Sequence, residues 1–495
     1  MYFIIPKSHN DLGTAFKMGA NSQNYGGTHD LADIESRIIN FRRVITQLPP
    51  EDHAMLPSLL YDLGSSFQSR FLFGGDSAGD LVDIESAISN FQKAIELVPE
   101  DDNRLTEWVY ELGISLESRF IHTGNLADSD GAISNLQRVI HLTPEDSYHL
   151  GGLCNHFFYL ARSYSYRYKF TQNPQDLARA ISGYHSAAIQ SHGRPMGRYI
   201  SAREWASLCH LNGHPDVLQA YGLAIELMPQ ITDLSQSIYT RTMQLSDASE
   251  LLSSATAAAI NAGEIVTAIN WLEQGRCIVW SQINQLRSPA IENLRVNYPS
   301  LVDYVLKVSQ DLVAVGTSRV VTAGTSRGIN PVKLRLDAMN PIDEVRRVHD
   351  LKCDWATILI RLRELPGLHN FLKPHTTSDL LAALPENGSI ITFSLHKDRC
   401  DIIALRSGED KPLHIPLRNF THQNAVKLRD NLRTYLHKNG IRMRDSDSRA
   451  GRPVYPEVER KAVVIFQVLR AIWECVMKPL LDGLGYSLVV CLVSF

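Results

Sequence analysis

DLVDIESAISNFQKAIELVPEDD, residues 80–102, places an apolar residue every three or four positions and then meets a proline. Apolar side chains at that spacing share one face of an α-helix, so the segment is predicted to form an amphipathic helix. Pro99 ends the helix because its ring removes a backbone donor and clashes with the preceding turn. The apolar positions are Ile84, Ala87, Ile88, Phe91, Ala94, Ile95 and Val98.

Two further segments align with this one without gaps: DLADIESRIINFRRVITQLPPED from Asp30 and NLADSDGAISNLQRVIHLTPED from Asn125. In all three copies a leucine is followed 18 residues later by a proline: Leu31 and Pro49, Leu81 and Pro99, Leu126 and Pro144. The alternative is a globular bundle of independent amphipathic helices, which would not keep this spacing three times. The first half of the chain is therefore predicted to be a repeat array.

A second element alternates with the first. It reads LGTAFKMGA from Leu12, LGSSFQSRF from Leu63, LGISLESRF from Leu112 and, more loosely, LARSYSYRY from Leu160. Small residues beside the leucine let two helices approach closely. A helix with such a notch, followed by a helix that ends in proline, resembles the tetratricopeptide repeat. That family's pattern is met by Ala87, Phe91, Ala94 and Pro99, loosely by a fourth copy (Ala180, Tyr184, Ala187, Pro195), and again by a fifth (Tyr221, Ala224, Pro229).

The repeat is longer than the family standard of about 34 residues. Its large second-helix residue recurs at intervals of 50, 45, 48 and 37, at Phe41, Phe91, Leu136, Tyr184 and Tyr221. We place the surplus in expanded loops between the two helices, at residues 71–80 and 169–176, because loop length costs little free energy. The resemblance implies an α-solenoid of about five repeats that holds a protein or peptide on its concave face.

Three arginines recur at one register near the end of the first helix: Arg70, Arg119 and Arg167. They could form a basic ladder that grips an acidic peptide. The interpretation we favour is a pair within the repeat, with an acidic residue of the adjacent loop or helix such as Asp80 or Glu85. The repeated asparagines are interpreted as solvated or loop-bonding positions rather than a clamp: Asn40, Asn90 and Asn135.

The sequence changes character from about Ala248. Residues 248–314 predict long connecting helices, and residues 315–341, where GTSR occurs twice, predict a flexible linker. Helix returns in DWATILIRLRELPGLHNFLKP, and after Pro385 the apolar period becomes two. The predicted elements are strands at 389–395, 400–406 and 412–417, a helix at 424–438, a polar loop, a helix through FQVLRAIWECVMKPLLDGL, and a last strand in YSLVVCLVSF.

Four blocks in this half resemble the CHAT domain, a relative of the caspases often found behind tetratricopeptide repeats. They are AINWLEQGRCIVWSQINQLRSP, the helix ending LPGLHNFLKP, the hairpin ITFSLHKDRCDIIALRSGEDKPLHIPL and the helix ending IWECVMKPLLDGL. The resemblance covers about residues 248–486. The predicted fold class is thus mainly α, a TPR-like solenoid (1–247) followed by connecting helices, the linker and part of an α/β caspase-like domain (342–495). The resemblance to the CHAT domain implies a central, mostly parallel sheet covered by helices on both faces.

The family resemblance also implies a cysteine nucleophile and a histidine base that cleave a peptide. The family's histidine follows the next strand in a Leu-Pro-X-His-Ala-Ala-Gly type of motif, and its cysteine lies further on. No residue of this chain occupies either position, so no catalytic residue is assigned and the chain is not expected to be an enzyme. We predict a non-catalytic binding scaffold; the alternative is a fragment of a repeat-gated CHAT cysteine peptidase. A shortened or incomplete chain would leave the apolar edge Ser487–Val493 unpaired.

Two other histidine–cysteine pairs could take the place of the family's catalytic residues. His396 and Cys400 lie four residues apart in SLHKDRC, where they flank a predicted turn. We interpret them as an ordinary turn histidine and strand cysteine; as a dyad they would have to approach within roughly 3–4 Å. His437 with Cys475 or Cys491 would need an accidental approach.

Composition excludes several other classes. Lys and Arg total 49 against 53 Asp and Glu, a net charge of −4, which disfavours a dedicated nucleic-acid binder. Seven scattered cysteines without CxxC spacing indicate neither a disulfide framework nor a zinc site. No HExxH, Walker A or GxGxxG motif is present, so no metal or cofactor is expected. With no apolar stretch near the ~20 residues that span a bilayer, we expect no membrane contact and a cytoplasmic location.

Overall fold

The computed structural model describes residues 31–73, 80–143, 150–231, 238–277, 295, 297–323, 341–365, 369, 371, 376–438 and 459–486. The chain divides into two compact units, Met1–Leu227 and Met228–Phe495. Each is described by itself.

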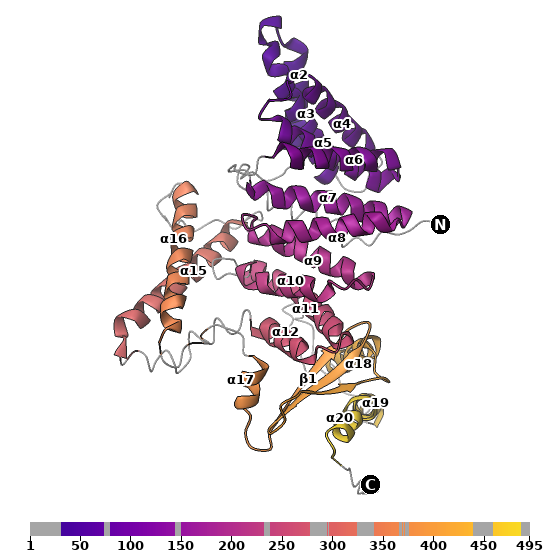
Figure 1. Ribbon diagram of the computed structural model, residues 1–495, viewed down its shortest axis with the longest axis vertical. Helices are drawn as coiled ribbons and strands as arrows, with labels where there is room; N and C mark the ends of the chain where they lie inside the picture. The colour runs from indigo at the N-terminus through magenta and orange to yellow at the C-terminus, as the bar shows by residue number, and fades with distance from the viewer. Residues whose placement is uncertain are drawn as a thin grey trace. The chain divides into compact units, whose positions relative to one another are not determined.

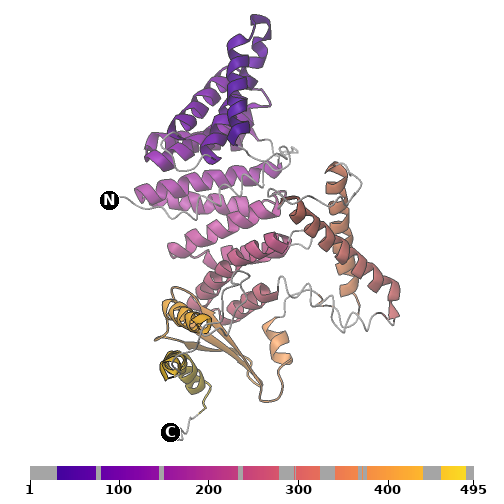
Figure 2. The ribbon, with the colours of Figure 1, turned by 180° about the vertical axis from the view of Figure 1, so that it is seen from behind.

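The first unit is a succession of helices, most of which pack against the next one along the chain, so that consecutive helices lie side by side (Figures 1 and 2). Its elements are α2 (Leu31–Gln47), the 3-10 turn η1 (Pro50–Met55), α3 (Leu56–Phe73), α4 (Asp80–Glu96), α5 (Leu105–Thr123), α6 (Leu126–Leu142), α7 (Leu150–Thr171), α8 (Pro174–Ile189), α9 (Pro195–Leu211) and α10 (Val217–Ile231). The predicted alternation of a first and a second helix is confirmed as repeat-like packing of helix pairs.

The notch in the first helix receives the large residue of the second. A Cβ on Gly64 of α3 would come within 2.9 Å of the Phe91 ring on α4, and one on Gly113 of α5 would lie 3.0 Å from Leu136 of α6. Phe91 is fully buried in a core that α2, α3 and α4 share. The Leu-Gly pattern therefore marks the places where paired helices approach most closely.

The prolines act as predicted in the first three copies and differently later. α2, α4 and α6 end before Pro49, Pro99 and Pro144. In the fourth copy Pro195 does not end α8 but begins α9, where its missing donor costs nothing. In the fifth, Pro229 lies inside the last turn of α10, which continues to Ile231. Pro229 removes one backbone donor of the helix, and only two residues of α10 follow it.

The prediction of an expanded loop at 169–176 was wrong. α7 runs to Thr171 and α8 begins at Pro174, so only two residues connect them, as only two connect α5 to α6. Each connection is a left-handed residue, Gly124 (φ 71°) or Gln172 (φ 58°), followed by an asparagine that caps the next helix. The extra length of those repeats therefore lies in longer helices and in the links between pairs. Of the other predicted loop, residues 74–79 lie outside the described residues.

The second unit begins with helices and continues into a small sheet. Its helices are α11 (Ile238–Asn261), α12 (Ile265–Cys277), α15 (Pro299–Ala323), α16 (Pro341–Arg363), α17 (Thr377–Ala382), α18 (His422–Lys438), α19 (Glu459–Ile472) and α20 (Lys478–Gly483), the last two joined by the π-helical turn Trp473–Met477. α15 extends to Ala323, into the stretch expected to be a linker, and residues 324–340 lie outside the described residues.

The strands are β1 (Ser389–Leu395), β2 (Cys400–Arg406) and β3 (Leu413–Pro416), which confirms the three predicted segments. Within the described residues they form one antiparallel sheet in the order β1-β2-β3. β1 and β2 pair from Ser389 opposite Arg406 to Leu395 opposite Cys400. The mostly parallel sheet that the family resemblance implies is not what these strands form, because short turns connect them and reverse the chain. The expected final strand, from Ser487 onward, lies outside the described residues.

One face of the sheet is covered by α18, α19 and α20, which carry the apolar side chains that pack on β2 and β3 (Figure 2). Among them Leu480 and Val476 contact the cluster that contains Ile402 and Ile415. α11 approaches β1. No helix in the described part of the chain combines the length and the apolar character that crossing a membrane requires.

Candidate functional site

Each of the three recurring arginines forms an ion pair with a carboxylate of the next helix. Arg70 makes a two-pronged ion pair with Asp83, at 2.6 and 2.8 Å. Arg119 pairs in the same way with Asp128, and Arg167 with Asp176, each at 2.6 and 2.9 Å. The predicted pairing within the repeat is confirmed, with these aspartates as partners. A basic ladder open to an acidic peptide is excluded at these positions.

The three aspartates recur at one position of the repeat, and this position could have identified them from the sequence. Each stands three residues after the residue at which the second helix begins or is capped: Asp80, Asn125 and Asn173. Asn125 and Asn173 accept a hydrogen bond from the backbone two residues on, as helix caps do. The recurring asparagines inside the helices are not loop-bonding: Asn90 and Asn135 donate to backbone carbonyls four residues earlier in their own helices.

Side-chain contacts also tie the first helices of successive pairs to one another. Glu117 of α5, which is 1 % exposed, binds Arg162 of α7 with both oxygens, at 2.7 and 3.0 Å. Arg162 in turn stacks over the Tyr159 ring, 4.2 Å from its centroid. Further contacts of this kind are Arg104 with Ser58, Tyr61 with Glu107, Gln68 with Ser115 and Tyr168 with Asn212. These polar groups serve packing between repeats.

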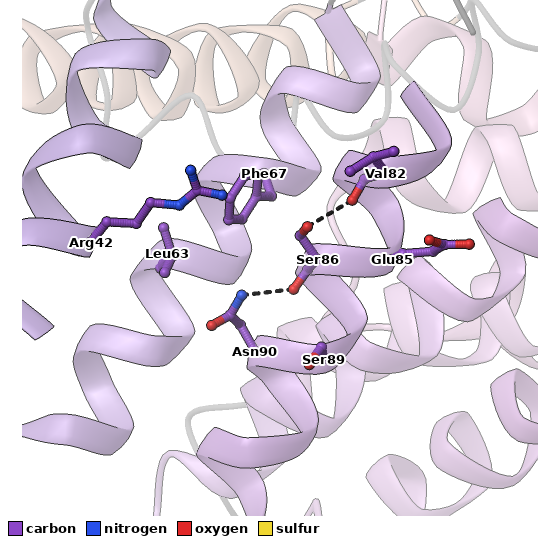
Figure 3. A pocket seen from close by; sticks show the side chains of 8 residues that line it. All are labelled: Arg42, Leu63, Phe67, Val82, Glu85, Ser86, Ser89 and Asn90. Carbon is purple, nitrogen blue, oxygen red and sulfur yellow. Dashed lines mark hydrogen bonds between the residues drawn. The ribbon is translucent and has the colours of Figure 1, made fainter. Parts of the chain in front are cut away.

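A pocket of about 420 Å³ opens between the second helices of the first two pairs. α2 and α4 form its walls and α3 lies at its base. Its lining residues are Arg42, Leu63, Phe67, Val82, Glu85, Ser86, Ser89 and Asn90 (Figure 3). The volume falls within the range of about 300–1,000 Å³ usual for ligand sites. Apolar, hydroxyl, amide and charged groups thus meet in one open cavity.

Arg42 forms one wall of this pocket. Its guanidinium lies over the Phe67 ring, 5.0 Å from the centroid, and Arg70 lies 5.6 Å from the same ring. Arg70 has Asp83 as its counter-ion. The described residues include no carboxylate within ion-pair distance of Arg42. The ring holds this cation by a cation–π contact, and none of the described carboxylates neutralises its charge.

The opposite wall belongs to α4. Asn90 donates from Nδ2 to the Ser86 carbonyl at 2.7 Å, and the Ser86 hydroxyl donates to the Val82 carbonyl at 2.7 Å. Figure 3 shows the Asn90 carbonyl oxygen on the side toward Leu63, whereas the Glu85 carboxylate points away from Arg42. The hydrogen bonds fix the amide, so its oxygen is presented as an acceptor.

His396 and Cys400 do not form an activated pair. The Cys400 thiol donates to the His396 backbone carbonyl at 3.8 Å and lies in the apolar cluster beneath α20. Burial raises the pKa of the Cys400 thiol, so the thiolate that a nucleophile requires is disfavoured. The imidazole Nε2 instead meets the Ser254 hydroxyl at 3.1 Å.

His396 contacts both Ser254 and Asp398, as the histidine of a hydrolase triad contacts its serine and its aspartate. The Asp398 carboxylate lies 3.3 Å from His396 Nδ1, but the Asp398 amide also donates to that nitrogen, at 3.3 Å. A ring that accepts at Nδ1 carries its proton on Nε2, which is the wrong tautomer for removing a proton from serine. The arrangement therefore docks the β1–β2 turn on α11, together with Ser253, which donates to the Leu395 carbonyl at 2.9 Å.

Asp401 completes this docking region. It is fully buried and accepts two bonds from Arg399, at 2.6 and 2.8 Å, and one from His414 at 2.8 Å. Burial alone would raise the pKa of Asp401, but the hydrogen bonds from Arg399 and His414 outweigh it and lower the pKa. Arg399 also donates to Asn261 at the end of α11.

The other substitute pair is not brought together in the described chain. His437 is exposed on α18, whereas Cys475 packs in the turn before α20, and Cys491 lies outside the described residues. Among the residues that are described, no three His, Cys, Asp or Glu side chains gather as a metal site would require.

Comparison with known proteins adds no family to these observations. A scan against protein-family models finds none that matches the chain, and a search of curated proteins finds no match either. The two family resemblances drawn from the sequence therefore stay predictions.

Proposed function

We propose that this chain is a binding scaffold for a peptide or protein, built from tetratricopeptide-like helix pairs and followed by a CHAT-like α/β region. The observation that carries the proposal is the pocket between α2 and α4, which lies within a run of repeated helix pairs. Stacked repeats offer extended surfaces for such ligands. The ligand's placement on the concave face, like the cytoplasmic location, stays a prediction.

The proposal assigns no catalytic residue and no cofactor. A cysteine peptidase needs a thiolate beside an imidazole. Burial raises the pKa of the buried thiols, to about 11 for Cys154, to about 12 for Cys209, and upward for Cys400. These thiols are interpreted as small apolar core residues.

Selection from a phage library of random 12-residue peptides on the immobilised full chain tests the binding function. Enriched peptides are synthesised, labelled and titrated by fluorescence anisotropy. We expect a recurring motif with micromolar affinity. Val82→Glu should weaken its binding at least tenfold, because Val82 is an exposed apolar side chain at the pocket.

Ile39→Glu is the matched control, since Ile39 is as exposed as Val82 but does not line the pocket. This variant should bind within twofold of the unchanged chain. The proposal is wrong if no peptide is reproducibly enriched, or if Val82→Glu and Ile39→Glu bind the selected peptides equally well.

A further inference from the structure

We propose that the pocket between α2 and α4 binds a carboxylate of its peptide through Arg42, and that the recognised segment joins an aspartate or glutamate to an apolar residue. This inference rests on the proposed binding function and specifies its ligand.

Seven arginines of the first unit have acidic partners among the described residues. These are Arg70, Arg104, Arg119, Arg138, Arg162, Arg167 and Arg203. Arg42 differs, because its guanidinium lies at a pocket wall without a carboxylate within ion-pair distance among the described residues. A cation held at a cavity and not neutralised by the protein is available to an anionic ligand.

The Phe67 ring prepares that guanidinium for a planar anion. A guanidinium lying over an aromatic ring keeps its N–H edges free, and a carboxylate can accept two parallel bonds from one edge. The ring is itself fixed, since Phe67 is buried. Arg70 also lies near this ring, and Asp83 neutralises the charge of Arg70. Arg42 is therefore positioned by packing before a ligand arrives.

The other pocket groups define what accompanies the carboxylate. Asn90 uses its amide nitrogen on the Ser86 carbonyl, so its Oδ1 is left as an acceptor suited to a backbone N–H of the ligand (Figure 3). Val82, with 62 % of its surface exposed, lines the same pocket as Leu63 and Phe67 and offers an apolar contact. A carboxylate, a backbone donor and an apolar side chain together describe an acidic residue beside an apolar one in an extended peptide.

Among the second helices of the first three copies, this register holds an arginine in α2 alone. The register of Arg42 is held by glutamine in the next two second helices, at Gln92 and Gln137. Gln137 is used within the protein, where its amide donates to the Tyr164 hydroxyl at 3.0 Å. The repeat pattern thus supplies the pocket shape, and one departure from the pattern supplies the cation.

A carboxylate fits better than a phosphate group. Phosphate recognition relies on clusters of arginines, whereas this pocket has one unmatched guanidinium and a glutamate, Glu85, in its lining. A dianion would meet the repulsion of that glutamate with a single cation to offset it. A phosphopeptide is therefore the outcome that the test must separate from an acidic one.

The experiment compares three forms of the tightest peptide from the phage selection on the full chain by fluorescence anisotropy. They carry glutamate, glutamine or phosphoserine at the acidic position. We expect the glutamate form to bind at least tenfold more tightly than the glutamine form and more tightly than the phosphoserine form. Arg42→Gln, which installs the residue of the neighbouring repeats, should remove the preference for glutamate.

Arg43→Gln is the control, because Arg43 is exposed on the same helix and does not line the pocket; its preference should stay within twofold. Arg42→Lys should retain part of the preference, because it keeps the charge without the planar fork. Circular dichroism checks that each variant is folded. Equal binding of the glutamate and glutamine forms, stronger binding of phosphoserine, or an equal effect of Arg43→Gln would overturn the inference while peptide binding itself stands. Failure to select any peptide would remove the proposed function as well.

Discussion

At the scale of single residues, Asp128 shows how the repeats use charge. Its side chain is 6 % exposed and its two oxygens are both bound by Arg119. Replacing it with asparagine would leave the Arg119 guanidinium, whose side chain is 25 % exposed, without its counter-ion. Removing one partner of a fully buried pair costs about 3–5 kcal/mol, and the partial exposure of Arg119 reduces that to about 2 kcal/mol. Urea unfolding of Asp128→Asn measures this loss.

Asp33 provides the matched control for that prediction. It occupies the same register in α2 but is exposed, and the sequence has Gly19 where the other copies have the arginine. Asp33→Asn should change the free energy of unfolding by less than about 0.5 kcal/mol. Equal losses in the two variants would show that the ion pair does not contribute as argued.

His156 of α7 makes stability depend on pH. Burial lowers the pKa of His156 from 6.5 to about 4. The folded protein therefore keeps the ring neutral, whereas the unfolded chain takes up a proton below pH 6.5, so this stability is present above 6.5 and lost as the pH falls toward 4. The free energy of unfolding should drop by about 2 kcal/mol more between pH 7 and pH 5 in the unchanged protein than in His156→Gln.

Urea titrations at the two pH values check that difference, with the exposed His192→Gln as control. The control should reproduce the pH dependence of the unchanged chain. A pH dependence that His156→Gln leaves intact would contradict the assignment of the neutral ring to this position.

Cys400 should react slowly, since it is buried in the cluster under α20 and its pKa is raised by that burial. Iodoacetamide attacks thiolates, so Cys400 should be labelled at least tenfold more slowly than the exposed Cys353 in the native protein at neutral pH. Mass spectrometry of tryptic peptides over time gives both rates. Faster labelling of Cys400 would revive its pairing with His396.

At the scale of elements, the contact between Gly64 and Phe91 sets how closely α3 and α4 approach. Alanine gains about 1 kcal/mol of helix propensity over glycine. At Gly64 its Cβ would stand 2.9 Å from a fully buried ring, and overpacking of that kind costs about 1–3 kcal/mol. Gly64→Ala should therefore destabilise the chain by about 1 kcal/mol.

The same substitution in a Phe91→Ala background should be neutral or stabilising, because the ring atoms that an alanine Cβ at position 64 would crowd are then absent. A double-mutant cycle in urea measures the coupling between the two positions, which should exceed about 0.5 kcal/mol. Additive effects would mean that the notch does not receive this ring.

The helices were predictable because their information is local. An apolar period of 3.6 and a following proline indicate a second helix whatever surrounds it, and the period of two gave the β1–β2 hairpin in the same way. The connections were not predictable by that reasoning. A left-handed residue such as Gln172, followed by the capping Asn173, closes a corner in two residues. Nothing in the polarity of KFTQNPQD distinguishes that corner from a longer loop.

The pocket could not be predicted from the sequence, for a related reason. The residues of α2, α3 and α4 that line it are separated in the chain, and only the packing of three helices brings them together. The three recurring arginines illustrate the same limit. Their common register can be seen in the sequence, whereas the choice of Asp83 over Asp80 or Glu85 as the partner of Arg70 depends on which way each side chain turns. The departure of Arg42 from the glutamine of later repeats was the one readable sign of a special groove.

At the scale of the whole molecule, the chain forms two compact units, and we propose a different role for each. The first supplies repeated helix pairs and the pocket. The second contributes an antiparallel sheet whose turn is docked on α11 by Ser253, Ser254 and Arg399. The account places ligand binding in the first unit alone.

Hydrogen–deuterium exchange of the full chain, with and without a saturating amount of the tightest glutamate-bearing peptide from the selection, tests that placement most directly. The account predicts slower exchange confined to α2, α3 and α4, the helices that line the pocket. Protection that falls instead on the helices or strands between α11 and α20, or no protection anywhere at saturation, would contradict it.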